Sequence, residues 1–155
     1  MIKNKIIKLI FLLRISLYRN ALKYQVGAAI EHQNLLKSLN FKTIVDVGAN
    51  KGQFALMSRY CFSDARIVSF EPLSAPAKIF SKVFKNDKDT TLYNVAIGPK
   101  EEEAIIHISK SDDSSSLLPI SDLQEEIFPG TGVAGISTVN VAPLDAFLSK
   151  ADIKP

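Results

Sequence analysis

Apolar and polar positions follow one another along this chain in blocks that predict alternating strands and helices. Mostly apolar runs occupy residues 43–47, 66–70 and 91–97, as expected for buried parallel strands. Between them, residues 53–62 and 75–84 carry apolar side chains at three- and four-residue steps, the spacing of helices packed on a sheet. This order predicts an α/β fold built on a parallel sheet.

The pattern changes after the turn pair at residues 98–99, which ends the third strand. Residues 104–109 and 136–141 alternate in polarity, so we expect two half-exposed strands that pair antiparallel. No helix of convincing period lies between them, and this stretch is expected to contain two loops, residues 111–116 and 128–132. A short helix over residues 144–150 ends the pattern.

The amino-terminal part reads as helical and is treated as a separate segment, residues 1–40, ahead of a domain over residues 41–155. Residues 21–39 keep helical spacing and predict one helix that leads into the sheet. Residues 6–17 are strongly apolar but interrupted by Lys8 and Arg14, which leaves too short a core for a membrane span or a secretory signal. Two interpretations remain: a helix packed on the domain, or an interfacial helix through which residues 1–20 contact an anionic membrane.

Composition narrows the class of protein. The 155 residues are 46% hydrophobic and 23% charged, which predicts one globular core. The net charge of +3 and the lack of a basic block interleaved with aromatics argue against nucleic acid as a partner. Cys61 has no partner for an internal disulfide, which suggests a reducing, cytoplasmic compartment. Cys61, His32 and His107 share no zinc-like spacing, so no metal site is expected, and His107 is not assigned as a catalytic base.

The candidate chemistry lies where the first two strands end. Asp46 ends the first apolar run, and the turn that follows has two glycines four residues apart, Gly48 and Gly52, with Ala49 and Asn50 between them. Glycines let a ligand approach the main chain closely, and the N–H groups at a helix entrance point outward. Glu71 ends the second strand, where its two oxygens could accept hydrogen bonds from a ribose diol. This arrangement predicts a nucleoside-bearing cofactor.

The spacing of the two glycines indicates which kind of nucleoside cofactor the turn could bind. Dinucleotide sites use G-x-G-x-x-G, whereas this turn reads G-x-x-x-G, which disfavours an NAD-dependent dehydrogenase. A ligand without a diphosphate, S-adenosylmethionine, fits better. At the end of the third strand, Asn94 and Ala96 would flank its adenine, a placement that rests on topology alone. The alternative is a tight turn that binds nothing.

Four blocks of the sequence resemble, in order, motifs of the FkbM-type methyltransferases. They are residues 46–53 (DVGANKGQ), 69–72 (SFEP), 94–98 (NVAIG) and 141–145 (VAPLD). The resemblance implies a class I Rossmann-like fold, S-adenosylmethionine as methyl donor, and O-methylation of a hydroxyl on a sugar, glycolipid or natural product. It places six residues in the cofactor pocket: Asp46, Gly48, Asn50, Gly52, Glu71 and Asn94. The serine run at residues 114–116 resembles the family's loop near the reaction side, so Ser115 and Ser116 are candidate substrate contacts.

Members of this family continue into a fourth strand that is not present in this sequence. We therefore expect a partial domain, with an antiparallel insertion after the third strand and an uncovered edge on the first. Such an edge favours self-association. Two functions follow as hypotheses: a methyltransferase whose activity is reduced by the missing part, or a non-catalytic module that binds a nucleoside or assembles with other chains.

Overall fold

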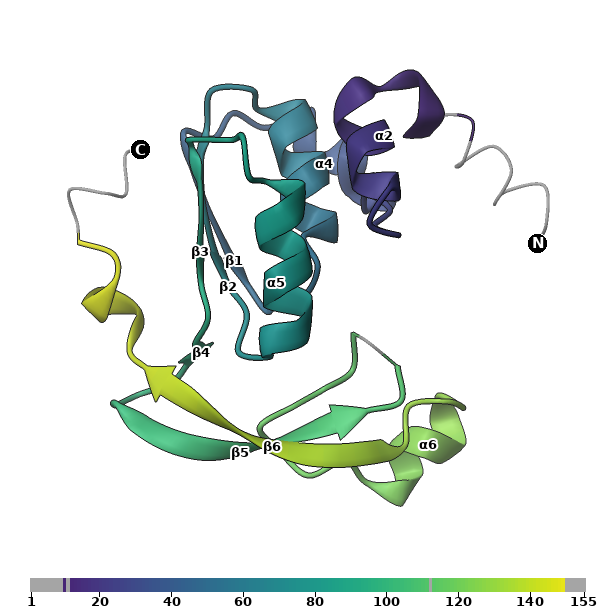
Figure 1. The fold of residues 1–155 in the computed structure, drawn as a ribbon, viewed down its shortest axis with the longest axis vertical. Helices are drawn as coiled ribbons and strands as arrows, with labels where there is room; N and C mark the ends of the chain where they lie inside the picture. The colour runs from purple at the N-terminus through teal and green to yellow at the C-terminus, as the bar shows by residue number, and fades with distance from the viewer. Residues whose placement is uncertain (1–9, 11, 112, 150–155) are drawn as a thin grey trace.

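The computed structural model describes residue 10, residues 12–111 and residues 113–149. At its centre, strands β1 (Thr43–Val47), β2 (Arg66–Phe70) and β3 (Thr90–Tyr93) form a parallel sheet in the order β1-β2-β3. Helices α4 (Gln53–Cys61) and α5 (Ser74–Val83) join these strands and lie on the same face of the sheet (Figure 1). The alternating α/β order predicted from the sequence is confirmed.

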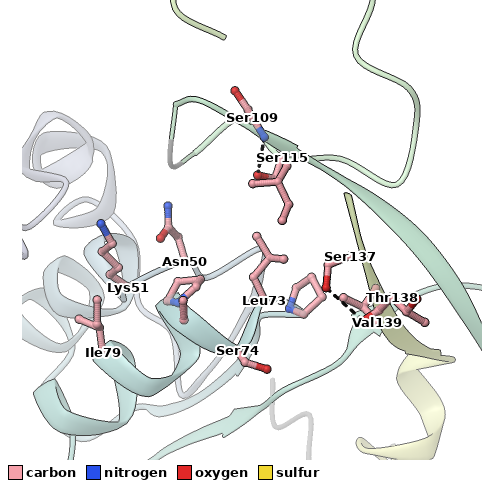
Figure 2. A pocket seen from close by; sticks show the side chains of 14 residues that line it. Asn50, Lys51, Leu73, Ser74, Ile79, Ser109, Ser115, Ser137, Thr138 and Val139 are labelled. Carbon is pink, nitrogen blue, oxygen red and sulfur yellow. Dashed lines mark hydrogen bonds between the residues drawn. The ribbon is translucent and has the colours of Figure 1, made fainter. Parts of the chain in front are cut away.

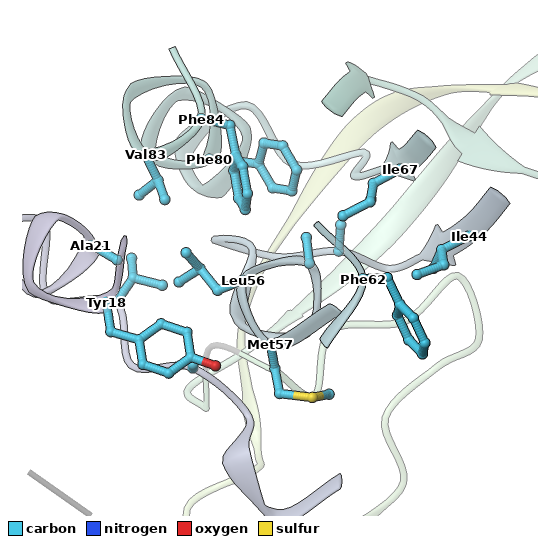
Figure 3. Packing of buried hydrophobic residues seen from close by; sticks show 14 of the residues in the cluster. Tyr18, Ala21, Ile44, Leu56, Met57, Phe62, Ile67, Phe80, Val83 and Phe84 are labelled. Atoms are coloured by element: carbon cyan, nitrogen blue, oxygen red, sulfur yellow. The ribbon is translucent and has the colours of Figure 1, made fainter. Parts of the chain in front are cut away.

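The larger part of the core lies between this sheet, its two helices and helix α2 (Ser16–Leu22). Leu56 of α4 is fully buried between Ala21 of α2 and Phe80 of α5 (Figure 3). Tyr18 of α2 is also buried, so this part of the amino-terminal segment packs on the domain. Residues 1–9 and 11 lie outside the described part of the chain, and membrane contact through residues 1–20 stays a prediction. No helix among the described residues combines the length and the apolar character needed to cross a bilayer.

The single helix predicted over residues 21–39 is wrong. Helix α2 ends at Leu22, and the chain then runs without helix to η1 (Ile30–His32) and the one-turn α3 (Gln33–Leu36). Gln25 has a φ of 60°, outside the helical region, and turns the chain. Val26 and Ala28, two residues apart, are both about 1% exposed. Val26, which also matched a helical period, is thus buried by a segment that is not helical.

The third predicted strand is divided in two. Strand β3 ends at Tyr93, and after Asn94 and Val95 the two-residue strand β4 (Ala96–Ile97) pairs parallel with β6 (Val133–Ala142) in a second sheet. Strand β6 also pairs antiparallel with β5 (Glu102–Ser109), which confirms the predicted antiparallel pair. The order of this second sheet is β4-β6-β5. Strands β5 and β6, which we call the arm, extend beyond the carboxyl ends of the three parallel strands (Figure 1).

A short helix that the sequence analysis missed connects the two strands of the arm. Helix α6 (Asp122–Ile127) begins after Ser121, whose hydroxyl accepts a hydrogen bond from the Gln124 N–H. Ser121 and Gln124 form the S-x-x-Q spacing of a capping box, a signal that hydrophobic periodicity does not contain. The predicted helix at residues 144–150 is a shorter 3-10 turn, η2 (Leu144–Ala146), and residue 150 lies outside the described part.

The face of the parallel sheet opposite α4 and α5 is only partly covered. Phe147, just after η2, contacts the rings of Phe70 and Tyr93 at centroid distances of 5.4 and 4.6 Å. Strand β1 pairs with β2 alone among the described strands, and Val45 and Val47 on its open face are 36% and 57% exposed. The expected uncovered edge is therefore present within the described residues, while self-association through it stays a prediction.

One arginine joins the carboxyl end of α4 to the starts of β2 and β3, at the edge of the sheet away from the glycine turn. The Arg59 guanidinium, whose side chain is 10% exposed, pairs with Asp87 at 2.8 Å and donates to the carbonyl oxygens of Ser63 and Ala65 and to the Thr90 hydroxyl. A planar guanidinium can make these bonds together, whereas an ammonium can keep only part of them.

We expect Arg59→Lys to lower the free energy of unfolding by about 1 kcal/mol, because the partly buried Ala65 carbonyl oxygen and the Thr90 hydroxyl lose their donor. Urea unfolding followed by circular dichroism measures this. Arg14→Lys, at an exposed arginine outside this network, is the control. Equal stability of the two variants would contradict the proposed role of Arg59.

Candidate functional site

The candidate site lies at the carboxyl ends of β1 and β2, where the chain leaves each strand. The N–H groups of Gly48 and Ala49 both donate to the Phe70 carbonyl oxygen at 2.9 Å, so the turn after β1 is fixed to the last residue of β2. The Gly52 N–H then donates to the Ala49 carbonyl at 2.9 Å and closes the turn before α4. Carboxyl ends of parallel strands are where open α/β sheets bind their ligands.

The two glycines of this turn have different roles. Gly48 has a φ of 80°, and a Cβ built there would meet no other atom within 4 Å, so open space lies above it. Gly52 has a φ of 95°, and its Cβ would lie 2.7 Å from a Phe84 ring carbon. Gly52 is therefore required for the left-handed backbone and for the close packing of α4 on the end of α5. Asn50, with a φ of 49°, also has a left-handed conformation, which asparagine tolerates well.

Glu71 joins the turn to the end of β2. Its carboxylate is 6% exposed and accepts two main-chain hydrogen bonds of 2.8 Å: Oε2 from the Asn50 N–H and Oε1 from the Leu73 N–H. Burial raises the pKa of Glu71, and these two bonds oppose the rise. Each carboxylate oxygen has a second lone pair, so the same group can still accept from hydroxyl donors.

Asp46 is a buried acid of the site with one unsatisfied carboxylate oxygen. It is 9% exposed, and its Oδ2 makes no hydrogen bond to any described residue. Burial, together with the charge of Glu71, raises the pKa of Asp46 to about 6. A buried carboxylate without a partner is costly, and a cation beside it would remove that cost.

A hollow of about 320 Å³ opens beside Asp46. Its walls come from the glycine turn, from the segment around η1 and from the loop after β5. Among the described residues that line it are three acids, Glu31, Asp46 and Asp113, and no lysine or arginine. We call it the acidic hollow.

Sequence reasoning missed part of this hollow. The single helix predicted over residues 21–39 gives no reason to expect His32 near Asp46, yet the turn at Gln25 brings His32 to the same hollow. Glu31 and Asp113 reach it from segments far apart in the sequence, and no local motif signals their meeting. Among the described residues, no cluster of three histidine, cysteine or acidic side chains is arranged to hold a metal ion.

The two candidates after β3 lie in different surroundings. Asn94 is exposed, and its amide donates to the carbonyl oxygens of Glu71 and Pro72 at 2.7 and 2.9 Å, which links the ends of β2 and β3. Ala96 is 6% exposed and packs with residues of the second sheet, away from the acidic hollow. Contact of either residue with adenine stays a prediction.

The two candidate serines, Ser115 and Ser116, also lie in different surroundings. Ser115 lines a second hollow, of about 520 Å³, between the start of α5 and the arm (Figure 2). Ser116 instead exchanges main-chain hydrogen bonds with His107, and its hydroxyl accepts from the Leu118 N–H. We call the second cavity the serine hollow. Asn50 lines both hollows, so they lie on two sides of the same turn.

Comparison with models of protein families finds a match for this chain. The model of the methyltransferase FkbM domain matches residues 46–155, from the last part of β1 onward. The match includes Asp46, the glycine turn and Glu71. Comparison with curated proteins and with solved structures finds no match. Given the family match over most of its length, the chain belongs to the FkbM methyltransferases, a family that uses S-adenosyl-L-methionine.

Proposed function

We propose that this domain transfers the methyl group of S-adenosylmethionine to a hydroxyl oxygen of a sugar, glycolipid or natural product. The observation that carries the cofactor part is the buried Asp46 carboxylate, whose Oδ2 makes no hydrogen bond to a described residue, in a hollow lined by two further acids. The cofactor's sulfonium and ammonium groups are cations of the kind that such a hollow favours.

The residues present fit the cofactor in three respects. Gly48 leaves open space above the turn, Asp46 Oδ2 is left without a hydrogen bond and could pair with a cation, and Glu71 keeps lone pairs for a ribose diol. The bound cofactor would supply a methyl group already activated by its positive sulfur. The chain would contribute mainly binding and alignment, which can supply much of the rate of such a transfer.

The hydroxyl acceptor is supported by family membership and by the hydroxyl side chains of the serine hollow. A module that binds the nucleoside without catalysis would share the cofactor contacts but would transfer no methyl group. Isothermal titration of the chain with S-adenosylhomocysteine tests the common step. No binding at roughly 1 mM ligand, a weak affinity for a cofactor site, would contradict both functions.

Glu71→Gln should weaken S-adenosylhomocysteine binding by about 30-fold or more. The amide can accept from one of the two main-chain donors only, and its own N–H₂ group would face the other, so the glycine turn shifts and the diol loses a charged acceptor. Glu101→Gln, at an exposed glutamate, is the matched control. Unchanged affinity in Glu71→Gln, with an unchanged melting temperature, would exclude Glu71 from the cofactor site.

Asp46→Asn should stabilise the chain without cofactor at pH 7. The pKa of Asp46 is raised from 3.8 to about 6, so the folded protein binds this proton more tightly than the unfolded chain does. The free energy of unfolding that this gives is complete below about pH 4 and is lost as the pH rises through 6. The asparagine avoids this loss, which is at most about 3 kcal/mol. Urea unfolding at pH 4 and pH 7 should show a gain at pH 7 alone, and a gain of equal size at both values would refute the electrostatic explanation.

Binding of S-adenosylmethionine near pH 6 should release a fraction of a proton. A cation beside Asp46 lowers the pKa of that carboxyl from about 6, so protonated molecules lose their proton on binding. Calorimetry in two buffers of different ionisation enthalpy measures the release, which should approach roughly half a proton at pH 6. The release should disappear in Asp46→Asn, and its persistence there would assign it to another group.

A further inference from the structure

A third hollow, of about 550 Å³, lies between α6 and the loop after β5. Helix α6 stands at the end of the arm where β6 begins, whereas β4 pairs with the other end of β6 (Figure 1). The described residues that line this hollow are Ser111, Asp113, Ser114, Ser115, Gln124, Phe128 and Thr131. All of them except Phe128 carry a side-chain oxygen or nitrogen. We call this cavity the aromatic hollow, after Phe128.

Phe128 lines the aromatic hollow although 62% of its surface stays exposed. Its main chain is held on both sides, because its N–H donates to the Gln124 carbonyl at 2.8 Å and its carbonyl accepts from the Thr131 hydroxyl at 2.8 Å. The Gly130 N–H donates to Glu125 Oε1 at 3.0 Å, which fixes the turn after Phe128 to α6. An aromatic side chain on a fixed main chain loses little conformational freedom when a ligand covers it.

Two polar side chains of this hollow have hydrogen-bonding groups to spare. Among the described residues, none donates to or accepts from the side-chain amide of Gln124, which offers both donors and an acceptor. The Ser115 hydroxyl accepts from the Ser109 N–H at 3.1 Å and donates to no described residue, so its hydrogen is available to a ligand.

Asp113 adds an acceptor that its neighbours orient. Its Oδ1 accepts from the Ser111 hydroxyl at 2.7 Å and from the Ser114 hydroxyl at 3.3 Å. The Ser111 bond holds the pKa of Asp113 below its ordinary value, so this side chain is a carboxylate at neutral pH. A carboxylate has about four lone-pair sites, and the two bonds to Oδ1 leave places for ligand hydroxyls.

These groups together fit a neutral sugar unit. The hydroxyls of a sugar both donate and accept, and its face of C–H groups can lie against the electron-rich face of the Phe128 ring. A simple organic cation would leave the donors of Gln124 and Ser115 without acceptors. No lysine or arginine is among the described residues that line the hollow, so nothing there favours an anionic sugar. The volume is enough for a glycosyl unit or more.

The aromatic hollow adjoins the other two hollows. Ser115 also lines the serine hollow, and Asp113 also lines the acidic hollow. A glycan with one unit in the aromatic hollow can therefore continue past Ser115 into the serine hollow, which reaches the glycine turn at Asn50.

We propose that the aromatic hollow binds one unit of a neutral glycan, and that a neighbouring unit of the same glycan occupies the serine hollow. The role of this glycan as methyl acceptor rests on the proposed methyltransferase function. The proposal narrows the acceptor class from any hydroxylated molecule to a glycan longer than one unit. Phe128, Gln124 and Asp113 position the glycan and take no part in the transfer itself.

The test begins with the full chain on an array of neutral glycans that runs from monosaccharides to short oligosaccharides. We expect binding to a subset of the glycans longer than one unit. A glycan that binds is then titrated in solution beside the methyl glycoside of its terminal unit, and it should bind about tenfold more tightly. NMR signals of both Gln124, in the aromatic hollow, and Leu73, in the serine hollow, should shift with the longer glycan.

Phe128→Ala removes the ring and should weaken the longer glycan by about tenfold. Phe128→Trp keeps an aromatic face and should keep the affinity. Ile127→Ala is the matched control, since Ile127 is 58% exposed on the same helix and does not line the hollow. Gln124→Ala should weaken the glycan by about threefold, because hydrogen bonds from the amide are lost. None of these variants should change S-adenosylhomocysteine binding.

Three results would overturn the inference. One is an array without any glycan longer than one unit whose binding depends on Phe128. Another is an equal loss of binding in Phe128→Ala and Ile127→Ala. The third is a shift at Gln124 without a shift at Leu73, which would confine the glycan to the aromatic hollow.

Binding of S-adenosylhomocysteine, measured separately, distinguishes this inference from the proposed function. If it is intact while the glycan results fail, only the inference falls. If Phe128-dependent glycan binding is found without S-adenosylhomocysteine binding, the glycan site stands and the methyltransferase role is removed.

Discussion

The site depends on the pair of hydrogen bonds that the Glu71 carboxylate accepts from the N–H groups of Asn50 and Leu73. The Asn50 bond fixes the turn after β1, and the Leu73 bond fixes the turn that leads into α5. The same carboxylate therefore sets the distance between the two helix entrances at the edge of the sheet. Asn50 lines both the acidic and the serine hollow and Leu73 lines the serine hollow, so this interaction fixes part of the wall of each of these hollows.

The arrangement requires two acids to lie close together in a buried place. Glu71 is compensated by main-chain donors, whereas Asp46 Oδ2 makes no hydrogen bond to a described residue and has a raised pKa. A charge kept without a partner lowers the stability of the empty protein, and the lost stability returns when a cation binds. Binding sites commonly contain such groups, because a fully satisfied site would have nothing left to offer a ligand.

Together with the arm, the glycine turn lines a second hollow. In the part of the chain that the structure describes, β5 and β6 lie beyond the carboxyl ends of the parallel strands and close the serine hollow against the start of α5. The loop after β5 also brings Asp113 to the acidic hollow. The segment after β4 thus contributes to both of these hollows beside the same turn.

The sequence by itself determined the elements whose pattern is local. Apolar runs and helical spacing predicted the three parallel strands and helices α4 and α5. The glycine spacing and the acid after the second strand predicted that the turn after β1 and Glu71 would lie together, and in the structure the Asn50 N–H of that turn donates to Glu71. These predictions succeed because strand pairing and backbone conformation limit such short segments to few arrangements.

Only the tertiary structure decided how distant segments meet. The break at Asn94 follows from pairing of β4 with β6, which lies more than thirty residues further along the chain. The turn at Gln25 interrupts the predicted helix, and the segment after it brings His32 to the wall of the acidic hollow. A hydrophobic pattern cannot decide these cases, because an extended segment and a helix can bury the same residues, and the surrounding core selects between them. The three acids of the acidic hollow, Glu31, Asp46 and Asp113, likewise come together only once these segments are packed.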